Sequence, residues 1–201
     1  LSVPLLQGLV PLPVNGSLPR LPRRNPMADS STLTRSDSKG GVRMVDVSDQ
    51  PDSIRTAVAA GRVVLGKEAF DAVRDKNVRK GDVLTTAQIA GIQGSKQTSH
   101  LIPLCHDVQI DGVEIEFTLD EDKHAVEIRA FTKSIGLTGV EMEALTAVSI
   151  SALTIYDMCK SIARDIYIED VRLLAKTGGQ SGNWKNDRPE PVTSEAPASV
   201  N

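Results

Sequence analysis

One continuous run, from Gly139 to Lys160 with the sequence GVEMEALTAVSISALTIYDMCK, most strongly constrains how this chain can fold. Its apolar residues recur at intervals close to one helical turn, a pattern that predicts an amphipathic helix from about Val140 to Ala163. Thr138, followed three residues later by Glu141, fits a capping box at the start of this helix. We expect its core-facing stripe to consist of Met142, Leu145, Val148, Ala152, Leu153 and Tyr156.

Carboxylates interrupt the predicted helix near both of its ends. Glu143 and Asp157 are 14 residues apart, which brings them to nearly the same azimuth but separates them by about 21 Å along the axis. One small substrate cannot easily contact both groups on one helix. If both take part in catalysis, the site is either long or shared between the start of this helix in one subunit and its end in another. We favour a site shared at a subunit interface.

The composition divides the chain into one domain and two polar tails. Residues 1–40 hold six of the eleven prolines and a Ser/Asp/Gly-rich patch, so we predict a disordered amino-terminal tail. Residues 186–201 are again polar and proline-rich and are predicted to form a second disordered tail. Residues 41–185 suffice for one domain with a hydrophobic core. The acid-poor, arginine-containing leader is interpreted either as an untargeted tail or as the remnant of an organelle transit segment.

The composition also excludes several classes of protein. No apolar run approaches the roughly 20 residues needed to cross a bilayer, so no membrane span is expected. Two cysteines are too few for a disulfide scaffold and indicate a reducing compartment, either the cytoplasm or, if the leader is a transit remnant, the mitochondrial matrix. The formal charge is −3, and it becomes −6 without Arg20, Arg23 and Arg24, which precede the first acidic residue. With only six aromatic residues as well, the domain is not expected to bind nucleic acid.

Between the tails, the strand and helix patterns are those of an α+β domain. Strands are predicted near residues 42–47, 53–65 and 167–176, and helices near residues 67–74 and 83–96. The clearest hairpin pairs Val113–Leu119 with Ala125–Phe131, because both runs alternate apolar and polar side chains around a polar turn. We therefore predict a ferredoxin-like antiparallel sheet with helices covering one face.

Reactive groups concentrate at the ends of these elements and in glycine-rich stretches. Four segments contain most of them: Lys80–Asp82, Gly91–Lys96, Leu101–His106 and Lys176–Gly182. Backbone N–H groups beside a lysine suit a phosphate, although each segment taken alone is more typical of an ordinary turn or a surface lysine. The number of such segments favours the functional interpretation.

Two further patterns leave alternatives open. His106 follows an apolar segment, where an imidazole can be a hydrogen-bonded core residue, a proton shuttle or a metal ligand. Its neighbour Cys105 gives poor spacing for zinc, so no metal site is predicted. Asp157 and Lys160 share a helix face at i, i+3 spacing, which is typical of a surface ion pair and equally of an acid–base pair.

Six motifs follow one another in register between about Leu33 and Trp184. They are KGDV (Lys80–Val83), AGIQGSK (Ala90–Lys96), LIPLCH (Leu101–His106), TGVEMEALTA (Thr138–Ala147), LTIYDMCK (Leu153–Lys160) and LLAKTGG (Leu173–Gly179). Together they closely resemble the cyclic pyranopterin monophosphate synthase family of molybdenum cofactor biosynthesis. The resemblance implies a lyase that converts a 3',8-cyclised dihydro-GTP to cyclic pyranopterin monophosphate and pyrophosphate. It also implies a homohexamer, a trimer of dimers with its sites at the dimer interfaces.

The resemblance further implies roles for individual residues. Asp157 and Lys160 resemble the central catalytic pair. The pocket and the basic groups around it correspond to Leu104, Cys105, His106, Met142, Glu143, Lys80, Lys96, Lys176 and Arg55. We expect Lys160 to act as general acid or base with Asp157 setting its pKa. The ring protons are assigned to Glu141, Glu143 and His106. No cofactor is required, although Mg²⁺ can accompany the triphosphate.

Two positions depart from the family pattern. Asp107 stands where many members carry proline, and Gln180 stands where a second lysine is common. Both changes make the expected polyphosphate site less positive, so we expect them to affect substrate affinity rather than the type of reaction. Two other function classes compete with the synthase. A nonenzymatic nucleotide-sensing oligomer would need only the basic loops, and a metallohydrolase using His106, Glu141 and Glu143 would lose activity with a chelator.

Overall fold

A five-stranded antiparallel sheet is the framework of residues 41–188, which are the residues that a computed structural model of the chain describes. The elements follow in the order β1 (Ser53–Val64), α1 (Lys67–Arg74), α2 (Val83–Ser95), α3 (Thr98–Leu101), β2 (Gly112–Asp120), β3 (Ala125–Gly136), α4 (Glu141–Cys159), β4 (Tyr167–Thr177) and β5 (Trp184–Lys185). The predicted amino-terminal tail, and all but three residues of the predicted carboxy-terminal one, lie outside the described residues.

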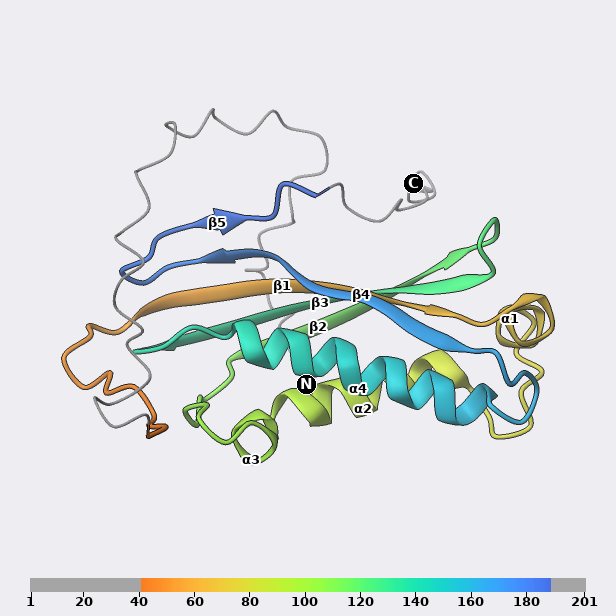
Figure 1. The fold of residues 1–201 in the computed structure, drawn as a ribbon, viewed down its shortest axis with the longest axis horizontal. Coiled ribbons are helices and arrows are strands. Elements are labelled where there is room, and N and C mark those ends of the chain that lie inside the picture. Colours follow the sequence, from red (N-terminus) through yellow and green to blue (C-terminus); the bar gives the residue numbers. More distant parts are fainter. Residues whose placement is uncertain (1–40, 189–201) are drawn as a thin grey trace, which may run out of the picture. The chain divides into compact units, whose positions relative to one another are not determined.

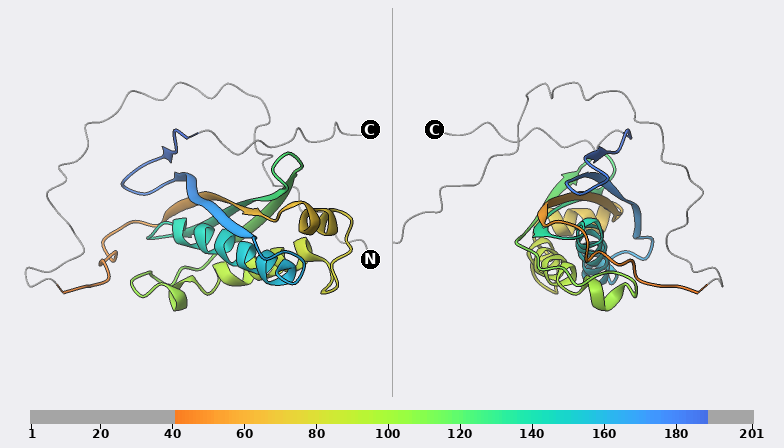
Figure 2. Two further views of the ribbon diagram at one scale, coloured as in Figure 1. Left: turned by 45° about the vertical axis from the view of Figure 1, so that its right-hand side comes forward. Right: turned by 90° about the vertical axis from the view of Figure 1, so that its left-hand side faces the viewer.

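The strands lie in the order β2-β3-β1-β4-β5, and every neighbouring pair is antiparallel. α2 and α4 cover one face of this sheet (Figures 1 and 2). The predicted α+β class is therefore confirmed. The predicted hairpin is confirmed as well, because Leu119 is paired with Val126 and Val113 with Thr132. Within the described residues, no helix has the length and hydrophobicity that crossing a membrane requires.

The strand predicted near residues 42–47 is absent. Only Val42 forms an isolated bridge there, and the segment is otherwise without regular structure and largely exposed. The carbonyl of Val45 accepts a hydrogen bond from a histidine side chain, at 2.7 Å, instead of from a neighbouring strand. Alternating apolar residues thus predicted a strand in a segment that forms only one bridge.

The long helix α4 is shorter than the expected Val140–Ala163, and its buried face differs from the expected stripe. Val148 and Ala152 are fully buried as predicted, but Leu153 is 56% exposed. The buried face consists mainly of small residues with a few larger ones: Ala144, Thr146, Ala147, Val148, Ser151, Ala152, Ile155, Met158 and Cys159. The predicted capping box is wrong, because the N-cap is Val140 and no side chain caps the helix.

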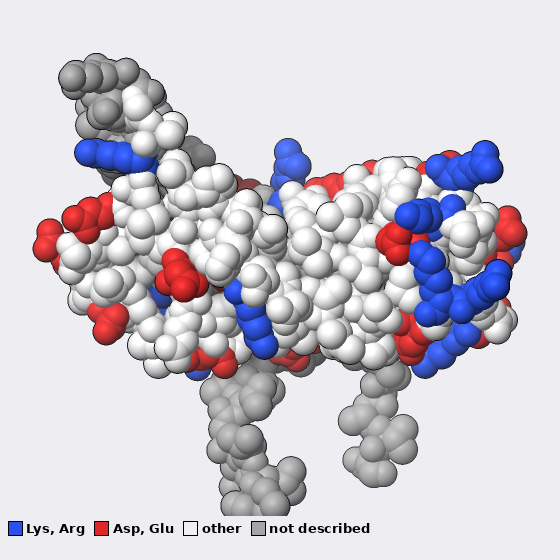
Figure 3. Space-filling model, turned by 90° about the horizontal axis from the view of Figure 1, so that it is seen from below, with Lys and Arg blue, Asp and Glu red and all other residues white. Residues whose placement is uncertain are grey.

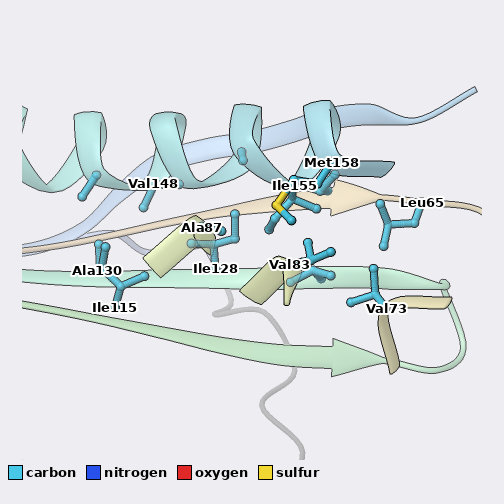
Figure 4. Packing of buried hydrophobic residues seen from close by; sticks show 14 of the residues in the cluster. Leu65, Val73, Val83, Ala87, Ile115, Ile128, Ala130, Val148, Ile155 and Met158 are labelled. Atoms are coloured by element: carbon cyan, nitrogen blue, oxygen red, sulfur yellow. The ribbon is translucent and has the colours of Figure 1, made fainter. Parts of the chain in front are cut away.

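Small residues allow α4 to lie close to both the sheet and α2. A Cβ atom on Gly61 of β1 would lie 2.7 Å from the Cγ1 atom of Val148. A Cβ atom on Gly91 of α2 would lie 2.9 Å from the Ala147 carbonyl oxygen and would collide with the Ser151 hydroxyl. That hydroxyl donates to the carbonyl of Ala87 at 3.0 Å, which links the two helices. The larger core side chains fill the space between the helices and strands (Figure 4).

We expect Gly91→Ala to destabilise the fold, although alanine is the better helix former by about 1 kcal/mol. The added methyl group must displace the backbone of α4, which costs about 1–3 kcal/mol in a well-packed interior. The measurement is urea unfolding followed by circular dichroism. Gly112→Ala is the control, because nothing lies within 4 Å of the Cβ atom that it adds. A Gly91→Ala variant as stable as the wild type would contradict this account of the helix contact.

Candidate active site

The candidate residues form two clusters at opposite ends of α4. The helix-start cluster comprises Arg55, Cys105, His106, Glu141, Glu143, Lys176 and Ser181, and the helix-end cluster comprises Lys80, Asp157 and Lys160. Glu143 and Asp157 both lie on α4, so the helix holds them about 21 Å apart along its axis. One protomer therefore does not bring the two predicted groups of catalytic residues together.

In the helix-end cluster, Asp157 lies between two lysines. Its Oδ1 atom is 2.7 Å from the Nζ atom of Lys160, and its Oδ2 atom is 2.8 Å from the Nζ atom of Lys80. Hydrogen bonds from Lys160 and then Lys80 lower the pKa of Asp157 to about 2, and the same contact raises the pKa of Lys160. With Asp157 ionised and both lysines protonated, the cluster carries a net positive charge. It lies at the end of the helix-bearing face where lysine and arginine side chains gather (Figure 3).

In the helix-start cluster, an ion pair joins α4 to β4. The Nζ atom of Lys176 is 2.8 Å from the Oε1 atom of Glu141 and 3.0 Å from the hydroxyl oxygen of Ser181. The side chains of Lys176 and Glu141 are only about one quarter exposed, at 25% and 26%. Glu141 therefore contacts Lys176 of β4 and does not cap α4, the helix on which it lies.

Glu143 is the most unusual carboxyl group of the domain. It is 2% exposed, and its Oε2 atom is buried without a hydrogen-bond partner among the described residues. Its Oε1 atom lies 3.9 Å from the Cys105 sulfur, which donates to it. Burial, with smaller contributions from the negative charges of Glu141 and Asp107, raises the pKa of Glu143 to about 7. Such a carboxyl group can gain and lose a proton near neutral pH.

Burial also raises the pKa of the Cys105 thiol, and the charge of Glu143 raises it further. The thiol is therefore protonated at neutral pH and acts as a weak hydrogen-bond donor. Cys105 thus acts as a hydrogen-bond donor to Glu143 and not as a nucleophile on its own.

Arg55, also in this cluster, links the end of β3 to the glycine-rich turn after β4. It is 6% exposed, and it donates to the carbonyls of Gly136 at 3.2 Å and Leu137 at 2.9 Å. Its guanidinium also packs against Gly179, where a Cβ atom would collide with it. Arg55 thereby supports the glycine-rich turn after β4 and adds a positive charge next to it.

His106 is fixed through one ring nitrogen. Its Nε2 atom lies 2.7 Å from the carbonyl oxygen of Val45, and a carbonyl can only accept a hydrogen bond, so Nε2 carries the proton. The Nδ1 atom is left as the nitrogen that can accept a proton. This contact also fastens the segment before β1 next to the helix-start cluster.

Three predicted pocket residues, Leu104, Met142 and Lys96, belong to neither cluster. Leu104 is 42% exposed, Met142 is partly buried in the first turn of α4, and Lys96 is the exposed C-cap of α2. Two participants were missed by the sequence analysis: the Val45 carbonyl and the Ser181 hydroxyl. The serine could have been found from its place in a glycine-rich turn beside a lysine. A backbone carbonyl leaves no such signal.

The described residues offer no group of three or more His, Cys, Asp or Glu side chains that could hold a metal ion. Of the three side chains that the metallohydrolase hypothesis requires, His106 binds a backbone carbonyl and Glu141 binds Lys176. Two of the donors that this hypothesis requires, the His106 Nε2 atom and the Glu141 carboxylate, are therefore engaged in other contacts.

Comparison with known proteins gives a consistent assignment. The profile of the MoaC family matches residues 44–179. The cyclic pyranopterin monophosphate synthase of Salinibacter ruber is 69% identical over 160 residues, which cover 80% of this chain and 94% of that protein. The synthase of Heliobacterium modesticaldum is 55% identical over 152 residues, or 76% and 96% of the two chains. Human molybdenum cofactor biosynthesis protein 1 is 49% identical over 159 residues, which are 79% of this chain but 25% of the human protein.

The buried Glu143 predicts a characteristic pH dependence of stability. Its pKa is about 7 in the folded protein and 4.5 in an ordinary environment, so between these values the unfolded chain binds fewer protons than the folded one. The free energy of unfolding therefore falls as the pH rises from about 4.5 to about 7. We expect Glu143→Gln to remove this fall, which amounts to about 2–3 kcal/mol.

The measurement is urea unfolding at pH 5 and pH 8 of the wild type and Glu143→Gln. Glu114→Gln is the control, since Glu114 is an exposed carboxyl group on β2. Equal changes in stability between the two pH values in the wild type and in Glu143→Gln would contradict the assignment of a raised pKa to Glu143.

Proposed function

Because this chain belongs to the MoaC family, we propose that it converts (8S)-3',8-cyclo-7,8-dihydroguanosine 5'-triphosphate to cyclic pyranopterin monophosphate and pyrophosphate. This is a phosphorus–oxygen lyase step of molybdenum cofactor biosynthesis. The observation that carries the proposal is the 69% identity over 160 residues to a synthase. The family match over residues 44–179 includes all the charged side chains of both clusters.

The proposed reaction makes two chemical demands. Protons must be moved while the purine-derived ring is opened and rebuilt, and an oxygen of the ribose-derived part must then attack the α-phosphorus as pyrophosphate leaves. Glu143, with a pKa of about 7, and the Nδ1 atom of His106 are suited to the first demand. The protonated Lys160, oriented by Asp157, is suited to donating a proton and to stabilising developing negative charge.

Both demands fall on one substrate, whereas one protomer holds the two clusters about 21 Å apart. We therefore propose that each site combines the helix-start cluster of one subunit with the helix-end cluster of another, within a homohexamer arranged as a trimer of dimers. We also propose that the domain is ferredoxin-like. The order β1, helices, β2, β3, α4, β4 supports this assignment, with β5 added at the edge.

The proposed reaction needs no resident cofactor, and Mg²⁺ would enter with the triphosphate of the substrate. The compartment, cytoplasm or mitochondrial matrix, stays a prediction. A nonenzymatic nucleotide sensor is less well supported, because binding needs only the basic groups. Burying Glu143 with an unpaired oxygen costs stability, and such a cost is typical of catalytic sites.

We expect Lys160→Ala to lower turnover by about 10²–10⁴-fold, because it removes both a proton donor and a positive charge. The measurement is formation of the pterin product, followed by mass spectrometry, from the cyclised dihydro-GTP. Lys123→Ala is the matched control: Lys123 lies in the β2–β3 turn and is paired with Asp120 at 3.5 Å. Near-normal turnover of Lys160→Ala would remove Lys160 from the mechanism.

Mixed oligomers test whether the site is shared. We expect Lys160→Ala and Glu143→Gln each to have little activity alone. Their coexpression should give heterodimers in which one site of two keeps both clusters intact. Random pairing then restores about one quarter of wild-type turnover per site. No recovery in oligomers shown to be mixed, for example by two affinity tags, would place each complete site within a single subunit.

A further inference from the structure

The glycine-rich turn between β4 and β5 places a free hydroxyl group next to Lys176. Residues 178–182 reverse the chain, with Gly178, Gly179 and Gly182 at positive φ, and the N–H group of Gly182 donates to the carbonyl of Gly179 at 3.1 Å. The side chain of Asn183 accepts from the Gly178 N–H group at 3.3 Å. Ser181 is held in this turn with its side chain exposed.

The contact between Ser181 and Lys176 fixes which partner donates. An ammonium group can only donate, so the serine oxygen accepts from Lys176 over their 3.0 Å separation. The proton of the Ser181 hydroxyl remains available, and no acceptor among the described residues takes it. One proton of Lys176 also remains, since Glu141 and Ser181 occupy two of the three.

Further donors and a net positive charge surround this hydroxyl. The backbone N–H groups of Gly179, Gln180 and Ser181 donate no hydrogen bond within residues 41–188. Arg55 packs against Gly179 and Lys176 contacts Ser181, while Glu141 is the one carboxylate among residues 41–188 that pairs with Lys176. The turn thus presents several unpaired donors beside an excess positive charge, a combination that suits a phosphate group.

We propose that Ser181 is a phosphate-binding residue of the active site. Its hydroxyl accepts from Lys176 and donates to a non-bridging oxygen of the terminal phosphates, the part of the substrate that leaves as pyrophosphate. The proposal rests on the proposed function for the identity of the substrate. The contact of Ser181 with Lys176 distinguishes it from Thr177, whose hydroxyl is 2.6 Å from that of Thr56 and serves the sheet.

The test uses inorganic pyrophosphate as the probe, with the full chain and isothermal titration calorimetry. Ser181→Ala should weaken pyrophosphate binding about tenfold, because it removes one hydrogen bond to a charged group. Ser181→Thr keeps the hydroxyl and should bind within about threefold of the wild type. Thr177→Ala, which deletes a hydroxyl at the start of the same turn, should bind like the wild type.

Steady-state kinetics supply a second measurement. If Ser181 binds the phosphates in the substrate and in the transition state alike, Ser181→Ala raises KM about tenfold and leaves kcat within about threefold. Unchanged pyrophosphate binding in Ser181→Ala overturns the proposal. So does equal weakening in Thr177→Ala, which would point to a loosened turn. The proposed function fails separately, if the wild type binds pyrophosphate but forms no pterin.

Discussion

The close packing of α4 against the sheet and α2 is the constraint on which the rest of the structure depends. Small residues at this contact, Gly61 on β1 and Gly91 on α2, remove the side chains that would hold the helix away. A helix packed so closely on two sides cannot bend freely, so the distance between its ends is fixed. The functional groups at those ends therefore keep their separation, and a second subunit offers the simplest way to bring them to one substrate.

The two ends of α4 differ in their electrostatics. At the start, burial keeps Glu143 poised between its two protonation states near neutral pH, while Glu141 is neutralised by Lys176. At the end, Asp157 is firmly ionised between two protonated lysines. A buried group that exchanges protons and an exposed positive group that stabilises developing negative charge have complementary functions. A site that combines them can rearrange a ring and release pyrophosphate.

Much of the fold could be predicted from local patterns, since the β2–β3 hairpin, α1, α2 and the long helix α4 have strong periodicity or cap signals. Two failures have a common cause. The capping box and the strand near residues 42–47 failed where Glu141 binds Lys176 and Val45 binds His106, which are contacts between distant parts of the chain. The candidate residues were found by motif, and the contact between Asp157 and Lys160 followed from their i, i+3 spacing. The contacts of Lys80 with Asp157 and of Lys176 with Glu141 were not predicted, because they arise only through tertiary packing.

The central claim is that this one chain supplies all the groups that the reaction needs. It is tested most directly by incubating the purified wild-type protein, with no other protein added, with (8S)-3',8-cyclo-7,8-dihydroguanosine 5'-triphosphate and quantifying both products. The account predicts cyclic pyranopterin monophosphate and pyrophosphate in equal amounts. Tight binding of the nucleotide without release of pyrophosphate would contradict it and would favour a nucleotide-sensing oligomer.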